Sequence, residues 1–188
     1  MGMSAQDKMI TVANRLGLTS LKDMQGTTRM VYDSQTTAAL THTFFKGAAQ
    51  RAFPLTNVGA NGNQFQVDEA LLVEKIGFFV PSAADGISYN GIGSGGNLAS
   101  VKFDLVIGNK TVIKDATCEY GGEQAFFNDG AVASSVIDLE GVGILIPPQV
   151  EYYVIAKVFN PLSRTAVSAR LGCYLFGTGA LLNFNTTI

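Results

Sequence analysis

Charge is scarce in this chain of 188 residues. Lys, Arg, Asp and Glu make up 15% of it, whereas 47% of its residues are hydrophobic. Soluble domains usually carry about a quarter of their residues as charged side chains. The chain is long enough to bury a full core without disulfides or metals, so the shortage of charge falls on its surface. We expect large parts of that surface to be covered by other protein.

Histidine and tryptophan are also scarce, with one His and no Trp. Structural zinc sites need about four nitrogen or sulfur ligands and catalytic zinc sites about three. We therefore predict no metal site, no cofactor and no small-molecule substrate. A Ser-His-Asp mechanism would have to use His42, which lies between two threonines in an expected strand and has no nucleophile elbow nearby. We predict that His42 is structural and that the chain is not an enzyme.

Further absences bear on partners and location. The net charge is −2, so no global basic field marks nucleic acid as the principal ligand. The first ten residues lack a signal-peptide core, and no run reaches the roughly 18 apolar residues of a membrane span. We expect the chain to fold where it is made. Cys118 and Cys173 are expected to be buried thiols, with a disulfide between them as the alternative.

One helix is indicated, at the N-terminus. Ser4 stands three residues before Asp7 in the pattern of a capping box, and Gly17 ends the segment. Its apolar face is formed by Met9, Val12, Ala13 and Leu16. Such a short helix is marginal in water and must dock on something. We predict that residues 1–40 form an arm used in assembly, separate from a β domain over residues 41–188.

The basic residues of this arm recur at intervals of seven. They are Lys8, Arg15, Lys22 and Arg29. On a continuous helix they would form one slowly drifting stripe, although Gly17 interrupts it. We predict that the arm contacts other subunits through Met9, Val12 and Leu16 together with these four basic side chains. The basic side chains would face an anionic neighbour: lipid headgroups, genome or an acidic subunit.

From residue 41 onward the hydrophobic pattern has a period of two, which is typical of strands with one buried face. The expected strands span residues 41–45, 65–67, 72–80, 101–107, 110–114, 132–139, 142–146, 150–158 and 166–175. Their connections are too short or too glycine-rich for crossover helices, so we predict an all-β antiparallel sandwich or barrel of about eight strands. The core is predicted to include Phe103, Leu105, Tyr152, Val154, Leu171 and Leu175.

Two local patterns point to chemistry but lack the required context. Gly91 to Gly96 satisfy the G-x-G-x-x-G dinucleotide pattern, yet they sit in a loop that runs into a strand rather than opening a helix. We expect a mobile loop there. Asp138 and Glu140 share one strand face, as the paired carboxylates of a glycosidase could. That spacing is also found on any exposed strand, and we predict no sugar hydrolysis.

Three segments carry a family resemblance. They are Phe53-Pro54-Leu55-Thr56-Asn57-Val58 with Phe65 and the strand ending Lys75-Ile76-Gly77-Phe78-Phe79-Val80, the Pro-led strand Ile146 to Val154, and the closing stretch Val167 to Gly177. In order and texture they resemble single jelly-roll capsid proteins of icosahedral viruses, notably tailless bacteriophages. The resemblance covers residues 41–188 and implies an antiparallel jelly roll of about eight strands with an N-terminal arm.

The resemblance also implies a function. The chain would be a virion structural protein that self-assembles into an icosahedral shell through barrel–barrel contacts and its N-terminal arm. Its partners would be copies of itself and other virion proteins, with a weak contact of the arm to genome or inner membrane. It would be made in the host cytoplasm and reside in the virion. The arm is less basic than many genome-contacting arms, so the resemblance does not imply direct genome binding.

Two other classes of protein are compatible with a β-sandwich. A carbohydrate- or receptor-binding module, such as a phage fibre or adhesin domain, would use loops such as 85–97 and 119–130 as its site. A jelly-roll enzyme of the cupin kind normally needs a cluster of His ligands, which one His cannot supply. Large regular assemblies favour the capsid reading, and a discrete monomer or trimer retained on glycans favours the binding module.

Overall fold

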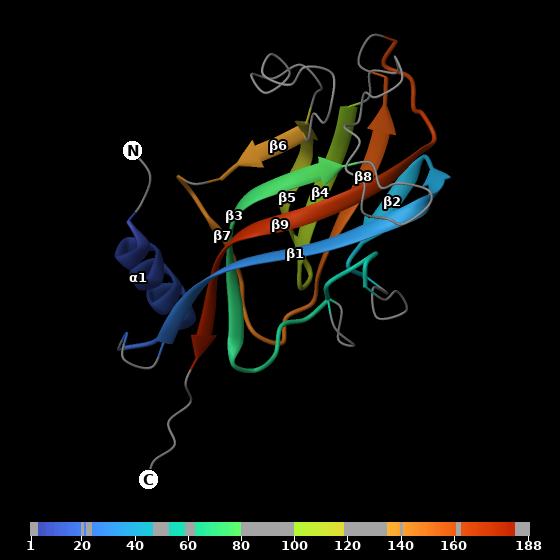
Figure 1. The fold of residues 1–188 in the computed structure, drawn as a ribbon. Coiled ribbons are helices and arrows are strands. Elements are labelled where there is room, and N and C mark those ends of the chain that lie inside the picture. The colour runs from blue at the N-terminus through green and yellow to red at the C-terminus, as the bar shows by residue number, and fades with distance from the viewer. Residues whose placement is uncertain are drawn as a thin grey trace, which may run out of the picture.

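One helix and nine strands are present in the described part of the chain (Figure 1). The computed structural model describes residues 4–19, 21, 24–46, 53–58, 63–79, 100–118, 135–139, 141–160 and 163–182. The elements are α1 (Ala5–Leu16), β1 (Met24–Ala39), β2 (Thr41–Phe44), β3 (Glu69–Phe79), β4 (Ser100–Ile107), β5 (Lys110–Cys118), β6 (Ser135–Asp138), β7 (Ile144–Ile146), β8 (Tyr152–Phe159) and β9 (Ala169–Leu182).

The strands form two antiparallel sheets. The first sheet has the order β1-β9-β3-β6, and β7 also pairs with β3; the second sheet has the order β2-β8-β4-β5. β6 pairs with residues 75–78 of β3 and β7 with residues 71–73. β6 and β7 therefore pair with successive parts of β3 and together occupy one position in the first sheet.

This strand order is that of a jelly roll. Counting β6 and β7 as one position, each sheet has four positions, and the chain passes from one sheet to the other at every connection except the β4–β5 hairpin and the β6–β7 turn. Eight strand positions in two sheets, connected as two Greek keys, define the jelly-roll sandwich. The predicted all-β antiparallel jelly roll is confirmed.

The core lies between the sheets. All six residues predicted for it are buried there, on β4, β8 and β9. Phe78 on β3 and Phe103 on β4 pack with ring centroids 5.1 Å apart, which joins the two layers. The alternation of side chains on these strands was enough to fix their buried faces. Cys118 and Cys173 are both buried and free, as predicted.

Residues 24–39 correct the predicted arm. They form β1, which pairs with β9 from Met24–Leu182 to Gln35–Leu171 and again at Ala39–Ala169. Val31 contributes to the core, and the Asp33 carboxylate is buried, accepting the Phe45 backbone N–H at 2.7 Å. The β domain therefore begins near residue 24 rather than at residue 41.

The expected strand at residues 65–67 is also wrong. The Phe65 carbonyl oxygen accepts the Gln149 N–H, and the Gln66 carbonyl oxygen accepts the Glu69 N–H, so the segment is a turn leading into β3. Its apolar character has a different cause. The buried Phe65 ring stacks on Tyr152 with centroids 5.2 Å apart and belongs to the core.

A β-bulge interrupts β3 at Glu74. Val73 pairs with Gly177 and Lys75 with Phe176, so Glu74 is an extra residue with no partner in β9. The neighbouring edge is broken at the same level, because the β6 pairing begins at Lys75 and the β7 pairing ends at Val73. Gly177 is required opposite the bulge, since a Cβ there would collide with the Leu72 carbonyl oxygen. Bulges of this kind redirect side chains.

Candidate functional site

Capping residues define both ends of the N-terminal helix. The Ser4 hydroxyl accepts the Asp7 backbone N–H at 3.2 Å, and the Asp7 carboxylate receives hydrogen bonds from Ser4, which completes the predicted capping box. Gly17 ends α1 in the left-handed conformation with φ 71°, a backbone shape that side chains disfavour. The Leu18 N–H then returns to the Ala13 carbonyl oxygen at 2.9 Å. Sequence-predicted and observed bounds agree.

The apolar stripe of α1 packs on the first sheet of its own chain. Val12 is fully buried. Around it lie Ala70, Leu72, Ala180 and Leu182, with Met9, Leu16, Leu18, Met24 and Leu145 packed at the margin. Figure 1 shows α1 beside the end of the sheet where β1 begins and β9 finishes. The expectation that Met9, Val12 and Leu16 are kept for another subunit is therefore corrected: the stripe is occupied within the chain.

A buried ion pair fastens the start of α1. Lys8 Nζ lies 2.8 Å from Glu74 Oε2, and the two side chains are 15% and 8% exposed. The Thr178 hydroxyl donates to Glu74 Oε1 at 2.6 Å. Both carboxylate oxygens are thus partnered, which offsets the cost of taking the charge out of water. Glu74 faces the helix because it follows Ala70 and Leu72 on the same side of β3, and the bulge then returns Ile76 and Phe78 to the core side.

Arg15 fastens the other end of α1. Its Nη1 donates to the Gly143 carbonyl oxygen at 2.7 Å and its Nη2 to the Val142 carbonyl oxygen at 3.0 Å. These acceptors lie in the turn between β6 and β7. The planar guanidinium suits this forked contact. The helix is therefore held at both ends by basic side chains that were predicted to face a neighbour.

The remaining two basic positions do not extend this stripe. Lys22 lies outside the described residues. Arg29 belongs to β1, where its Nη1 lies 3.0 Å from Glu69 Oε2 and its guanidinium sits 4.6 Å from the Phe65 ring centroid. Because α1 ends at Gly17, the spacing of seven has no continuous helix to act on. The structure brings Lys8 and Arg15 together on α1 and separates Arg29 from them.

Glu74 is the site residue that the sequence analysis missed. Its signal was present: Glu74-Lys75 interrupts an otherwise apolar run from Ala70 to Phe79. Two adjacent charged residues in a buried strand break its alternation and are a recognisable mark of a bulge. The identity of the cation that meets Glu74 could not be read from the strand itself.

His42 has the environment of a core residue. Its Nε2 donates to the Ala169 carbonyl oxygen at 2.8 Å, its Nδ1 lies 3.2 Å from Gln35 Oε1, and its ring stacks on Phe44. Burial lowers the pKa of His42, which keeps the imidazole neutral. The burial, the hydrogen bonds and the stacking on Phe44 agree with the structural role predicted for His42.

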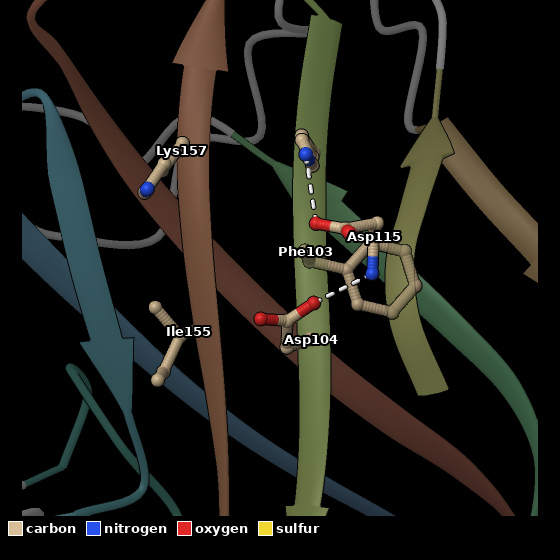
Figure 2. A pocket seen from close by; sticks show the side chains of 6 residues that line it. Phe103, Asp104, Asp115, Ile155 and Lys157 are labelled. Atoms are coloured by element: carbon tan, nitrogen blue, oxygen red, sulfur yellow. Dashed lines mark hydrogen bonds and ion pairs between the residues drawn. The ribbon is translucent and has the colours of Figure 1, made fainter. Parts of the chain in front are cut away.

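A second polar cluster lies on the outer face of the second sheet. Figure 2 shows Asp104, Asp115, Ile155 and Lys157, which line a small hollow there. Lys102 Nζ lies 2.7 Å from Asp115 Oδ1, with side chains 46% and 55% exposed, and Asp104 Oδ1 accepts the Asp115 backbone N–H at 2.6 Å. The Lys102 ammonium lowers the pKa of Asp115. The hollow, of about 40 Å³, is far smaller than ordinary ligand pockets.

The other sequence-derived candidates lie mostly beyond the described part of the chain. The glycine string 91–96, the loops 85–97 and 119–130, and Glu140 are all outside it. Among the described residues, no group of three His, Cys, Asp or Glu side chains could hold a metal ion. The single described helix, α1, is too short and too polar to cross a bilayer.

Comparisons with known proteins show a likeness in fold but none in sequence. No family model matches the sequence, and no curated protein matches it. A chain in the solved structure of Cocksfoot mottle virus is similar in fold, with a TM-score of 0.38 and 9% sequence identity. The match covers 85% of this chain and 95% of that one. At this level the likeness assigns no function, and the jelly roll described above follows from the strand order alone.

Proposed function

We propose that this chain is a virion structural protein that self-assembles into an icosahedral shell, in the manner of tailless bacteriophages. The observation that carries the proposal is the jelly-roll strand order. This fold serves viral capsids, lectin domains and cupins. The segments 53–80, 146–154 and 167–177 resemble the capsid group in sequence texture, and they contribute residues to β3, β8 and β9 of the two sheets.

The composition supports the capsid reading over the other two. A cupin site needs several His ligands, and the only His of the sequence is buried between Gln35 and the Ala169 carbonyl. Large apolar side chains are exposed, including Phe53 at 77% and Val142 at 70%. Together with a charge content of 15%, such a surface suits burial against other subunits better than a freely dissolved module. We also propose that the chain has no catalytic activity.

The docked position of α1 leaves its outward face available for a contact between subunits. The inner stripe of α1 is occupied, but Ile10 and Leu21 are each 38% exposed. They line a shallow apolar groove with Ala13, Asn14, Leu18 and Thr19. We propose that this outward face, rather than the inner stripe, meets a neighbouring copy of the chain. We propose accordingly that the folded protein is located in the virion.

The test is imaging of the purified full chain by negative stain, with light scattering. We expect closed shells of uniform diameter. Ile10→Asp should fold normally and assemble poorly, because an aspartate buried at a subunit contact is left unpaired. Gln6→Asp, on an exposed position of the same helix, is the matched control and should assemble as the wild type does.

Two outcomes would overturn the proposal. A full chain that stays monomeric at high concentration has no shell-forming activity. A discrete monomer or trimer that is retained on immobilised glycans belongs to the carbohydrate- or receptor-binding class instead. Equal assembly by Ile10→Asp and Gln6→Asp would reject the α1 contact while leaving the shell itself in place.

A further inference from the structure

We infer that α1 and the β6–β7 edge of the first sheet form one cooperative unit joined at Glu74, so that undocking of the helix loosens the edge. This goes beyond the proposed function and does not depend on it. The helix then acts as a strap on the sheet. Its position would report on, and respond to, the state of an edge strand that lies far from it in sequence.

Glu74 touches both parts of the unit. Its carboxylate binds Lys8 of α1 and Thr178 of β9. Its backbone carbonyl oxygen accepts the N–H of Leu139, directly after β6, at 2.6 Å. A shift of the bulge that releases the carboxylate from Lys8 would therefore also disturb the hydrogen bond that ends β6.

Arg15 connects α1 to the same edge of the sheet through the β6–β7 turn. The β6–β7 turn is built on the Leu139 carbonyl oxygen, which accepts the N–H groups of Val142 and Gly143 at 2.9 and 2.8 Å. The carbonyl groups of the same two residues accept Arg15. Glu74 and Arg15 therefore bind the same turn: Glu74 accepts the Leu139 N–H, and Arg15 donates to the carbonyl groups of Val142 and Gly143.

An apolar contact runs parallel to these polar ones. Leu72 packs with Val12 of α1 in the cluster beneath the helix. Its side chain also lies against Gly143, where an added Cβ would come within 2.9 Å of Leu72 Cδ1. Gly143 has φ 52°, a conformation that favours glycine. Removing the helix would therefore uncover the side chain on which the turn rests.

The edge itself is too short to be independent. β6 has four residues and β7 has three, and within the described part of the chain both pair along β3. Strands this short are marginal without neighbouring support. The support is supplied by Glu74 and Arg15. Segments that share such contacts open together in hydrogen exchange.

Amide hydrogen exchange of the full chain tests the inference. Glu74→Gln keeps the shape of the side chain and removes its charge, and Arg15→Met removes the contacts to the turn while leaving Glu74 in place. In each variant we expect exchange to rise about tenfold or more at residues 8–16 and also at residues 136–139 and 142–146, because a hydrogen bond to a charged group is lost.

Lys75→Met is the matched control. Lys75 lies in the same bulge, but its side chain is 41% exposed and pairs with Asp138 at 3.9 Å. We expect its loss to leave exchange in α1 unchanged. Should Glu74→Gln fail to fold, Thr178→Val removes one hydrogen bond from the same carboxylate and should raise exchange in the same two segments together.

Faster exchange in α1 with no change in the β6–β7 edge would overturn the inference, because the helix would then be a passenger on the sheet. Unchanged exchange in both segments would overturn it as well. Neither result bears on shell formation, which is measured separately by imaging, so failure of the strap and failure of the capsid function are distinguishable.

Discussion

The outer faces of the two sheets carry similar ion pairs in different surroundings. Beneath α1, Lys8 and Glu74 lie 2.8 Å apart and are 15% and 8% exposed. On the second sheet, Lys102 and Asp115 lie 2.7 Å apart and are about half exposed. Equal distances do not mean equal contributions, because water screens the exposed pair much more strongly than the largely buried one. The helix shields its ion pair from water, so breaking that pair should change the stability of the fold more than breaking the exposed one.

The largest expected effect lies in the layer that both sheets share. Leu171→Ala removes a fully buried side chain from the core and should lower the free energy of unfolding by about 2–5 kcal/mol. Val112→Ala, on an exposed position of β5, should change it by less than about 0.5 kcal/mol. Urea denaturation measures both. Equal midpoints would mean that the assigned strand faces are inverted.

Next in size is the buried ion pair. Lys8→Met leaves the Glu74 carboxylate buried with Thr178 alone and should cost about 1–3 kcal/mol of unfolding free energy. The cost cannot exceed the free energy with which α1 docks, since the helix can leave the sheet. Combining Lys8→Met with Glu74→Leu should recover most of the loss, because two apolar partners replace the pair. A double variant that is less stable than Lys8→Met would contradict this account.

A smaller, pH-dependent effect is expected at His42. Burial lowers its pKa below the ordinary value of 6.5, so on acidification the unfolded chain gains a proton before the folded chain does. Stability should therefore fall as the pH drops below about 6.5. Urea midpoints from pH 7.5 to 5.5 measure this, above the range where most carboxylates titrate. His42→Gln should flatten the slope, and an unchanged slope would place its cause elsewhere.

The smallest effect should come from the exposed ion pair. Lys102→Met and Asp115→Asn should leave the urea midpoint unchanged, because both side chains remain solvated after either change. Asparagine also tolerates the left-handed backbone at residue 115, where φ is 54°. A loss as large as that of Lys8→Met would erase the contrast between the two outer faces.

Much of this fold could be predicted from alternation and termini. The alternation of apolar residues predicted the core-facing sides of β4 and β8, and Ser4 and Gly17 predicted the bounds of α1. β1 could not be predicted in this way. It is an edge strand with exposed stretches near both ends and a central burial pattern that is not periodic. A Thr-rich edge strand of this kind carries no periodic signal.

Most residues of the candidate site on α1 could be predicted from the sequence, but the surface that they contact could not. The stripe of Met9, Val12 and Leu16 is real, yet no local pattern says which surface it covers. Lys8 and Arg15 were identified as interacting residues, and their partners proved to be Glu74 and the β6–β7 turn. These contacts join residues far apart in sequence through a bulge, and the register of a bulge is set by pairing across the sheet.

Sedimentation velocity of the full-length chain over a wide concentration range tests the central claim most directly, since a shell-forming protein must associate. The account predicts fast-sedimenting, uniform particles that appear above a threshold concentration, and a higher threshold for Ile10→Asp than for Gln6→Asp. A single boundary at the monomer mass of 19.9 kDa at every concentration would contradict it.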